Sequence, residues 1–398
     1  MQQPPKHSPT SFRTAPEMER HHVRNLAGAI LVAVDLFGLN SMFGQIFRNG
    51  YVGRLLDILA SPNPALPGSG APLLTSFLGL PYLDGVFKLA TVLWANVTDG
   101  THPQLSLYAF QFGGQLVPIF LVIMIEGSKS GNNGHALYYS VLWGYAMQTF
   151  GYAAIMPLYA AIHLFTSSTF TSSGKALAKA NKLRNPASFD LGVLIPAFSI
   201  GYLLPTLLMS LPVSSSSLHQ WFGALWQGFP LYVMIYQHVF ARVIKPPPQG
   251  DAETIDRAYD WAFNVAAATQ VSTYVIIFAA KTFPDLAPEW AARAFTFSSV
   301  FAPGPFHSHK PLASMAAAMH DFFKWDQYTG SAAALVWGVA LHVTSRKELM
   351  SFYEWLKLGV GILRWSALAG PAGAVVRLLQ RRDQAVISEH AQGTAKDL

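Results

Sequence analysis

Apolar runs of about 20 residues recur along nearly the whole chain, and they limit its possible folds more than any other feature. A run of this length crosses the hydrocarbon core of a bilayer as an α-helix. Only 12% of the 398 residues are charged, against roughly 25% in an ordinary soluble domain. We therefore predict an all-α, polytopic integral membrane bundle with roughly seven to nine transmembrane helices.

The candidate spans occupy most of the sequence: residues 26–46, 83–97, 105–125, 136–165, 189–211, 221–243, 261–283, 331–344 and 355–379. The second and the eighth are short for a core of about 30 Å, which favours tilted, half-buried or re-entrant segments. The sequence predicts a disordered polar tail over residues 1–24, one membrane domain over 25–380 and a polar C-terminal tail over 381–398.

Basic residues gather in the N-terminal tail and in the loop after the fourth candidate span: Lys6, Arg13, Arg20, Arg24, Lys175, Lys179, Lys182 and Arg184. The positive-inside rule places both segments on the cytoplasmic side. This topology accounts for the net charge of +6, so we expect membrane lipid and no nucleic acid as partners. The tail lacks the features of a signal peptide, so the first span is expected to insert uncleaved, in the endoplasmic reticulum. The oligomeric state is left open.

Several chemical mechanisms are excluded by the residues that the sequence lacks. There is no cysteine, so disulfides, thiolate nucleophiles and cysteine-ligated metals are ruled out. The sequence has no Asp-Asp-x-x-Asp or Asp-x-Asp-Asp motif, no Gly-rich phosphate loop and no His-Glu-x-x-His motif. We therefore expect no metal and no other cofactor, and predict acid–base chemistry on an apolar substrate.

Three carboxylic acids are the candidate catalytic residues: Asp35, Glu126 and Asp326. An ionised side chain at the centre of a bilayer costs about 2.5 to 3.5 kcal/mol, so such groups usually face a protein interior or a cavity. A neutral acid in a dry pocket avoids this cost and can still donate a proton. The alternatives are helix packing for Asp35, a local pair with Lys129 for Glu126, and helix capping for Asp326. We expect the three acids to share one aromatic-lined pocket if they act together.

Further polar and aromatic side chains are candidate substrate-binding residues: Gln111, Gln115, Asn132, Asp84, Trp143, Tyr145, His238 and Arg364. Both glutamines precede Glu126 on nearly the same helical face, which indicates the wall of a cavity. The alternatives are helix capping for Asp84, a structural bond to a backbone carbonyl for His238, and snorkelling, an ion pair or a lipid headgroup for Arg364.

Two more segments are relevant to a cavity. Six aromatic residues crowd the fourth candidate span, where they can form a membrane belt, core packing or a cavity wall: Tyr138, Tyr139, Trp143, Tyr145, Phe150 and Tyr152. Residues 312–323 can form an interfacial amphipathic helix that caps a cavity, since Met315, Met319, Phe322 and Phe323 share one side.

Several segments in order resemble those of fungal membrane-bound terpene cyclases encoded in meroterpenoid gene clusters, of the ascofuranone and macrophorin pathways. The segments are DGTHPQLSL at residues 99–107, FGGQ at 112–115, EGSKSGN at 126–132, WDQY at 325–328, LVW at 335–337, LAGPAGA at 368–374 and Arg382-Asp383. Lys129 stands where the family pattern has arginine.

The resemblance implies cyclisation of a farnesyl-type chain attached to an aromatic head, often after a separate enzyme has made a terminal epoxide. A carboxylic acid then starts the reaction, and we expect Glu126 or Asp35 to be the donor, Asp326 a second acid or base, and Gln115 and Asn132 orienting groups. A transporter for a small apolar metabolite and a non-catalytic membrane scaffold remain the alternative functions.

Overall fold

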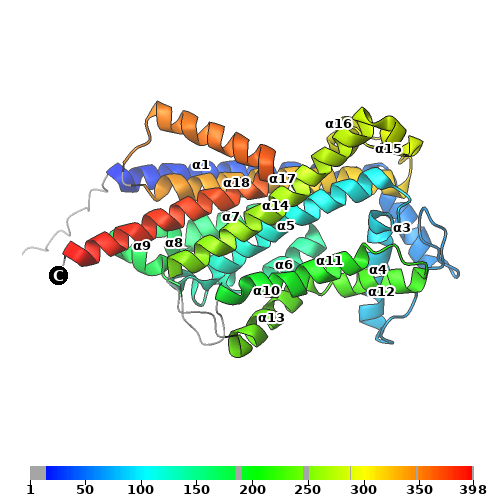
Figure 1. Cartoon of the computed structure of the whole chain (residues 1–398), viewed down its shortest axis with the longest axis horizontal. Coiled ribbons are helices and arrows are strands. Elements are labelled where there is room, and N and C mark those ends of the chain that lie inside the picture. The colour runs from blue at the N-terminus through cyan, green and yellow to red at the C-terminus, as the bar shows by residue number, and fades with distance from the viewer. Residues whose placement is uncertain (1–14, 184–190, 245–250, 287, 347, 397–398) are drawn as a thin grey trace, which may run out of the picture.

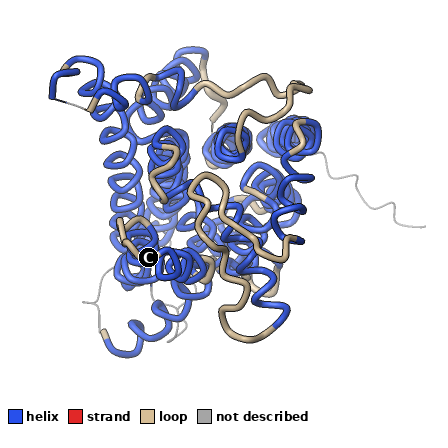
Figure 2. Tube along the Cα trace, turned by 90° about the vertical axis from the view of Figure 1, so that its right-hand side faces the viewer, coloured by secondary structure: helices blue, strands red, loops and turns tan. Residues whose placement is uncertain are grey.

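An apolar chain in lipid must satisfy its backbone hydrogen bonds internally, which helices do within one segment. The computed structural model describes residues 15–183, 191–244, 251–286, 288–346 and 348–396, and these ranges form an elongated bundle of helices (Figure 1). Viewed along the bundle, helices and loops account for the whole described trace, with no strand among those residues (Figure 2). The predicted all-α class is confirmed.

The bundle contains long and short helices. Those of the first half are α1 (Ala15–Leu39), α2 (Gln45–Arg48), α3 (Tyr51–Ala60), α4 (Pro81–Thr98), α5 (Pro103–Ser128), α6 (Ser140–Phe150), α7 (Tyr152–Thr166), α8 (Ser168–Thr171) and α9 (Gly174–Asn181). Those of the second half are α10 (Leu194–Phe198), α11 (Leu204–Met209), α12 (Ser216–Trp226), α13 (Phe229–Val243), α14 (Asp251–Thr282), α15 (Glu289–Ala294), α16 (Phe297–Phe301), α17 (Met315–Thr344) and α18 (Phe352–Lys396). Two π-helical turns, η1 (Asn40–Gly44) and η5 (Ser199–Leu203), follow α1 and α10.

Five helical segments of the described chain are long and apolar enough to cross a membrane: Glu19–Arg48, Pro103–Ser128, Leu191–Met209, Ala252–Thr282 and Phe352–Ile387. Large apolar side chains on their outer faces are exposed, such as Leu36 on α1 and Leu363 on α18. Such surfaces suit a lipid environment. The expected count of seven to nine spans is not confirmed.

Two of the expected spans are divided into shorter helices. The run at residues 136–165 breaks between α6 and α7 at Gly151, whose φ of +85° cannot continue a helix. The run at 221–243 breaks between α12 and α13 near Gly228, and Pro230 stands in the first turn of α13. Proline is favoured in a first turn because its missing N–H has no helical partner there. Glycine and proline therefore set the lengths of these helices.

Helix α5 forms the centre of the bundle. It packs against α4, α14, α17 and α18. In its most apolar stretch 78% of the residues are buried inside the protein, compared with 33% in the segment that contains α1. Its polar side chains therefore face other helices, and any group among them must find its partner within the protein.

Helix α17 is longer than the sequence indicated. The interfacial helix expected at residues 312–323 is not a separate element: from Met315 on, these residues are the first turns of α17, which continues to Thr344. Met319, Phe322 and Phe323 nevertheless line a cavity, as a capping segment would.

The chain ends differ from the expected tails where the structure describes them. Residues 1–14 lie outside the described residues, as does Arg184, and α1 begins at Ala15, within the expected N-terminal tail. Helix α18 continues through the expected C-terminal tail to Lys396. Arg382 and Asp383 in that helix are buried, with 1% and 3% exposure.

Candidate active site

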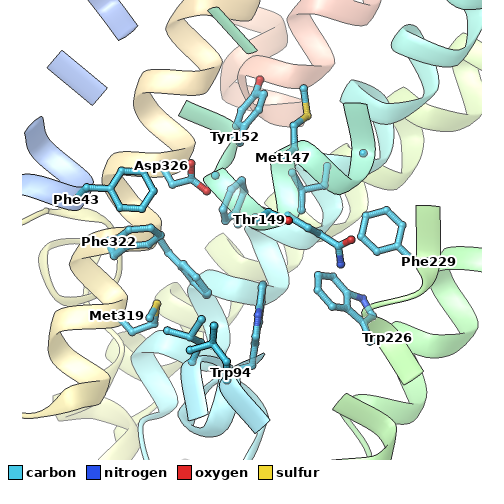
Figure 3. A pocket seen from close by; sticks show the side chains of 18 of the residues that line it. Phe43, Trp94, Met147, Thr149, Tyr152, Trp226, Phe229, Met319, Phe322 and Asp326 are labelled. Atoms are coloured by element: carbon cyan, nitrogen blue, oxygen red, sulfur yellow. The ribbon is translucent and has the colours of Figure 1, made fainter. Parts of the chain in front are cut away.

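A cavity of about 290 Å³ lies between the first turns of α17 and the helices α4, α5, α6 and α13. In Figure 3, Asp326 and Phe322 stand on one side of it, and Trp226 and Phe229 on the other. Most of its wall is apolar, and aromatic rings contribute much of it: Phe43, Trp94, Phe112, Phe120, Tyr152, Trp226, Phe229, Phe322 and Phe323. Aromatic faces attract cations, so this wall can stabilise positive charge that develops on an apolar ligand.

The rings of the wall pack against one another and hold its shape. The Trp94 ring lies 4.8 Å from that of Trp226 and 5.1 Å from that of Phe323, measured between centroids. Trp226 in turn lies 5.1 Å from Phe229. These four rings come from α4, α12, α13 and α17, so the wall is rigid only when those helices are assembled.

Asp326 is the acid of this cavity. It is 7% exposed, and among the described residues that line the cavity none is Lys or Arg. Its Oδ1 accepts a hydrogen bond of 2.7 Å from the backbone N–H of Ala153, in the first turn of α7. The first N–H groups of a helix lack helical partners, so Asp326 both caps α7 and faces the cavity. The capping alternative is therefore realised, though for a neighbouring helix.

Gly151 makes room for this carboxylate. A Cβ atom at this position would lie 2.9 Å from Asp326 Oδ1 and 2.6 Å from the Met42 methyl group. Its φ of +85° and ψ of 154° belong to a region that essentially only glycine adopts. The break between α6 and α7 thus lets the start of α7 approach the acid.

Glu126 is in a different environment. It is fully buried at the end of α5, where Oε1 accepts from Lys129 Nζ at 2.6 Å and from Arg382 Nη1 at 2.6 Å. Oε2 lies 3.1 Å from His163 Nε2. The pair with Lys129 was one of the alternatives for this residue, but Arg382 of α18 is a second partner from the far end of the chain.

Asp383 completes a buried ion network of two carboxylates, Glu126 and Asp383, and two cationic side chains, Lys129 and Arg382. Lys129 Nζ also donates to Asp383 Oδ1 at 2.7 Å, and the hydroxyl of Tyr259 donates to Asp383 Oδ2 at 2.9 Å. Arg382 Nη2 donates to Asn181 at 2.7 Å. Paired charges that also have their remaining hydrogen bonds filled can be buried at acceptable cost. The network joins α5, α9, α14 and α18, and it lies outside the aromatic cavity.

The structure does not bring the three candidate acids together. Asp326 lines the cavity and Glu126 belongs to the ion network. Asp35 belongs neither to the cavity lining nor to the network. Asp35 is half-buried on α1, and its Oδ1 is buried without a hydrogen-bond partner.

Comparison with known proteins identifies the family. The model of the CtvD domain matches residues 26–387, which is most of the chain. The chain belongs to the CtvD-domain family. It is 28% identical to terpene cyclase ascI of Acremonium egyptiacum, over 78% of this chain and 79% of the relative, and 28% identical to terpene cyclase janA of Penicillium janthinellum, over 78% and 82%. It is 26% identical to terpene cyclase ctvD of Aspergillus terreus, over 90% and 99%. No solved structure matches the chain.

Gln111 and Gln115 have structural partners in this CtvD-domain protein. Helix α18 is interrupted at Ala369 and Gly370, which leaves backbone groups without helical partners. Gln115 Nε2 donates to the Ala369 carbonyl at 3.0 Å, and its Oε1 accepts from Ala372 N–H at 3.2 Å. Gln111 Nε2 donates to Gln270 Oε1 at 2.6 Å. The predicted polar stripe therefore connects α5 to α14 and α18 and does not line the Asp326 cavity.

Asn132 and Asp84 hold loops. Asn132 Nδ2 donates to the Glu126 carbonyl at 2.8 Å, and its Oδ1 accepts from the Ser167 hydroxyl at 2.5 Å. Asp84 accepts from the N–H groups of Phe77, Leu78 and Gly79 at 2.8 to 3.1 Å, and so anchors the loop before α4.

The remaining four predicted substrate-binding residues also lie outside the cavity lining. The Trp143 ring N–H donates to the Ala136 carbonyl at 3.0 Å, and the Tyr145 carbonyl accepts from Thr149 at 2.8 Å. His238 Nδ1 lies 2.8 Å from the Met234 carbonyl, which is the structural bond considered for it. Arg364 is exposed on α18.

Sequence reasoning missed most of the aromatic wall. Of the aromatic cluster in the fourth candidate span, Tyr152 lines the cavity, whereas the other rings come from segments far apart in the chain. Phe43, Trp94 and Trp226 stand in ordinary apolar surroundings in the sequence, and no local signal distinguishes them from core residues. Arg382 and Asp383 had a signal, since they belong to the segments that resemble the family.

Proposed function

We propose that this protein is an integral membrane terpene cyclase in which Asp326 donates the proton that starts cyclisation. The supporting observation is the position of Asp326, as the one acid among the described residues that line an aromatic cavity without a cationic side chain. The relatives carry the name terpene cyclase, which supports the reaction class. An acid, a water-poor cavity and aromatic faces are the groups that a carbocation reaction needs.

The pKa of Asp326 also supports its role as a proton donor. It lies on α17, which is not among the five candidate spans. Burial raises its pKa to about 7, against the opposing effect of the N–H groups of Ala153 and Tyr152. A large fraction of the acid is then protonated near neutral pH, where a general acid works best when its pKa lies close to the working pH.

The proposed substrate is a farnesyl-type chain on an aromatic head, with a terminal epoxide. The proton moves from Asp326 to the epoxide oxygen, a C–O bond breaks, and a tertiary carbocation forms. Electron pairs of chain double bonds then form the ring bonds. The reaction ends when a proton returns to the Asp326 carboxylate, either from a carbon next to the final cation or from a substrate hydroxyl whose oxygen has bonded to that cation. The substrate and product are isomers, so the acid is regenerated and no co-reactant is consumed. We place the enzyme in the endoplasmic reticulum membrane, where such lipophilic substrates dissolve.

Asp326→Asn tests this proposal. Asparagine keeps an oxygen that can accept from Ala153 N–H, so the start of α7 remains capped, but the amide cannot donate the proton. We expect membranes that contain wild-type protein to convert a prenylated phenol with a terminal epoxide into cyclic product, and the variant to be slower by roughly 10²- to 10⁴-fold.

Asp321→Asn is the matched control. Asp321 is also an acid on α17, lies outside the cavity lining and accepts from Gly304 N–H at 3.1 Å. This variant should keep most of the cyclase activity. Product formation by Asp326→Asn at the wild-type rate would show that another group is the donor. Transport of the substrate by wild-type proteoliposomes without conversion would reject the enzyme class.

A further inference from the structure

Gln148 is a polar side chain of the Asp326 cavity that takes no part in the proton transfer described above. It lies in the last turn of α6 and lines the cavity, and its Oε1 and Nε2 are both buried without a hydrogen-bond partner. A buried amide without partners costs free energy that most proteins avoid, so such a group calls for an explanation. Two other polar groups of the wall have partners: the Trp226 ring N–H donates to Thr206 at 2.9 Å, and the Thr149 hydroxyl donates to the Tyr145 carbonyl at 2.8 Å. The Tyr152 hydroxyl is, like the Gln148 amide, buried without a partner among the described residues.

Gln148 and Asp326 line the same cavity. Gln148 precedes Gly151 by three residues, and a Cβ atom on Gly151 would lie 2.9 Å from Asp326 Oδ1. The end of α6 therefore carries Gln148 into the same cavity as Asp326. An amide offers both a donor and an acceptor, so it can bind an ether oxygen before reaction and the resulting hydroxyl afterwards.

We propose that Gln148 binds the substrate oxygen at the site of protonation and thereby selects oxygenated prenyl chains over hydrocarbon chains. This inference rests on the proposed function. No protein group in the described part of the chain pairs with the amide, and the substrate oxygen supplies its partner. A site built to hydrogen-bond a ligand discriminates strongly against an analogue that lacks the bonding group, because the site's polar atoms are then left unpaired.

Gln148→Met tests the inference, since methionine keeps the length of the side chain and removes its polar atoms. With the epoxide substrate we expect kcat/KM to fall by roughly tenfold to a hundredfold, and with the matching alkene to stay the same or rise. Because the variant removes an unpaired buried amide, its thermal midpoint should equal or exceed that of the wild type. Gln237→Met is the control, because Gln237 on α13 is also a buried amide without a hydrogen-bond partner among the residues that the structure describes, but lies outside the cavity lining. Its exchange should leave the substrate preference unchanged.

The outcomes separate this inference from the proposed function. Equal losses with epoxide and alkene, unchanged kinetics with both, or a lowered thermal midpoint would each overturn the role of Gln148. Conversion by Asp326→Asn at the wild-type rate would instead overturn the function of Asp326, whatever Gln148→Met shows.

A second cavity supports an independent inference about the rest of the substrate. It has a volume of about 810 Å³ and lies between α4, α5, η5, α11 and α14. Five side chains line both this cavity and that of Asp326: Trp94, Phe112, Leu116, Trp226 and Phe323. Its described lining has no acid and no Lys or Arg, but it carries several hydroxyl groups: Ser106, Ser199, Tyr202, Thr206, Ser210 and Thr269.

We infer that this larger cavity holds the aromatic head of the substrate while the chain end reacts beside Asp326. Small-molecule sites usually measure about 300 to 1,000 Å³, so the Asp326 cavity is small for a chain with its head attached. The larger cavity adjoins the smaller one across the five side chains that line both. Its hydroxyl groups donate to backbone carbonyls, so their oxygens remain available to accept a hydrogen bond from a phenol O–H. Its apolar surface suits an aromatic ring.

Ser106→Phe tests this site by filling it from α5. Ala367→Phe is the matched control, because it adds the same ring to an exposed position of α18 outside both cavity linings. Two substrates are compared, a prenylated phenol epoxide and a farnesyl epoxide without a head. We expect Ser106→Phe to raise KM about tenfold or more for the first substrate and to leave the second unchanged, whereas Ala367→Phe should change KM for neither. Equal effects on both substrates, or none, would overturn the assignment and leave the cavity to bilayer lipid. Failure of the wild type to convert either substrate would reject the proposed function itself.

Discussion

At the scale of single residues, the position of Asp326 depends on a glycine. Gly151→Ala adds a Cβ atom that would lie 2.9 Å from Asp326 Oδ1, in a backbone conformation with φ of +85°. We expect a loss of stability of about 1 to 3 kcal/mol from backbone strain. Cyclase activity per folded molecule should also fall, because the carboxylate must move. Thermal unfolding in detergent and product formation normalised to folded protein measure the two effects separately.

Gly134→Ala is the control for that prediction. Gly134 also has a positive φ, of +77°, but a Cβ atom there would meet nothing within 4 Å. This variant should lose stability through strain alone and keep its activity per folded molecule. Similar losses of activity in both variants would mean that strain, and not contact with Asp326, is responsible.

The same carboxyl predicts the pH dependence of the reaction. Burial raises the pKa of Asp326 to about 7, and the protonated form is the donor. Activity should therefore reach its full value well below pH 7, fall to about half near pH 7, and approach a decrease of about tenfold per pH unit at higher pH. A pH profile of kcat/KM between about pH 5 and 9 measures this. A rate that instead increases through pH 7 would indicate that the ionised carboxylate, acting as a base, is the working form.

At the scale of helices, the interrupted α18 depends on a side chain from α5. Gln115 satisfies the Ala369 carbonyl and the Ala372 N–H, so Gln115→Leu leaves two buried backbone groups without partners. We expect a loss of about 2 to 6 kcal/mol, since each of the two buried unsatisfied groups costs about 1 to 3 kcal/mol. Unfolding in detergent measures it. Gln111→Leu, which removes a bond to the Gln270 side chain, should cost less, and equal costs would contradict this role of Gln115.

The helices show what local sequence can and cannot predict. The apolar stretch of α5 was predictable because composition and length suffice to indicate a helix that can span a membrane. The break at Gly151 was not recognised, since a glycine inside an apolar run is also common in membrane helices. The partner of Gln115 was not predictable either. Its polarity indicated an interior position, but the backbone that it bonds lies more than 250 residues further along the chain.

At the scale of the whole molecule, the buried ion network is the feature that was least predictable from the sequence. Glu126 and Arg382 are 256 residues apart in the chain. Neither helical periodicity nor hydropathy relates residues at that separation. An unpaired acid in an apolar span is equally consistent with a catalytic site and with a structural pair, and only the assembled bundle shows that Glu126 has partners. The network links the end of α5 to the last long helix.

This arrangement predicts how the bundle responds when one charge is removed. Arg382→Met leaves Glu126 with less positive charge in a buried site, and breaking a buried pair costs about 3 to 5 kcal/mol. Adding Glu126→Gln should recover part of that loss, because the remaining Lys129–Asp383 pair, 2.7 Å apart, is neutral by itself. A double-mutant cycle of unfolding free energies in detergent measures the coupling. The folded double variant should also keep its cyclase activity, since the network lies outside the cavity. A stable but inactive double variant would return Glu126 to the catalytic machinery.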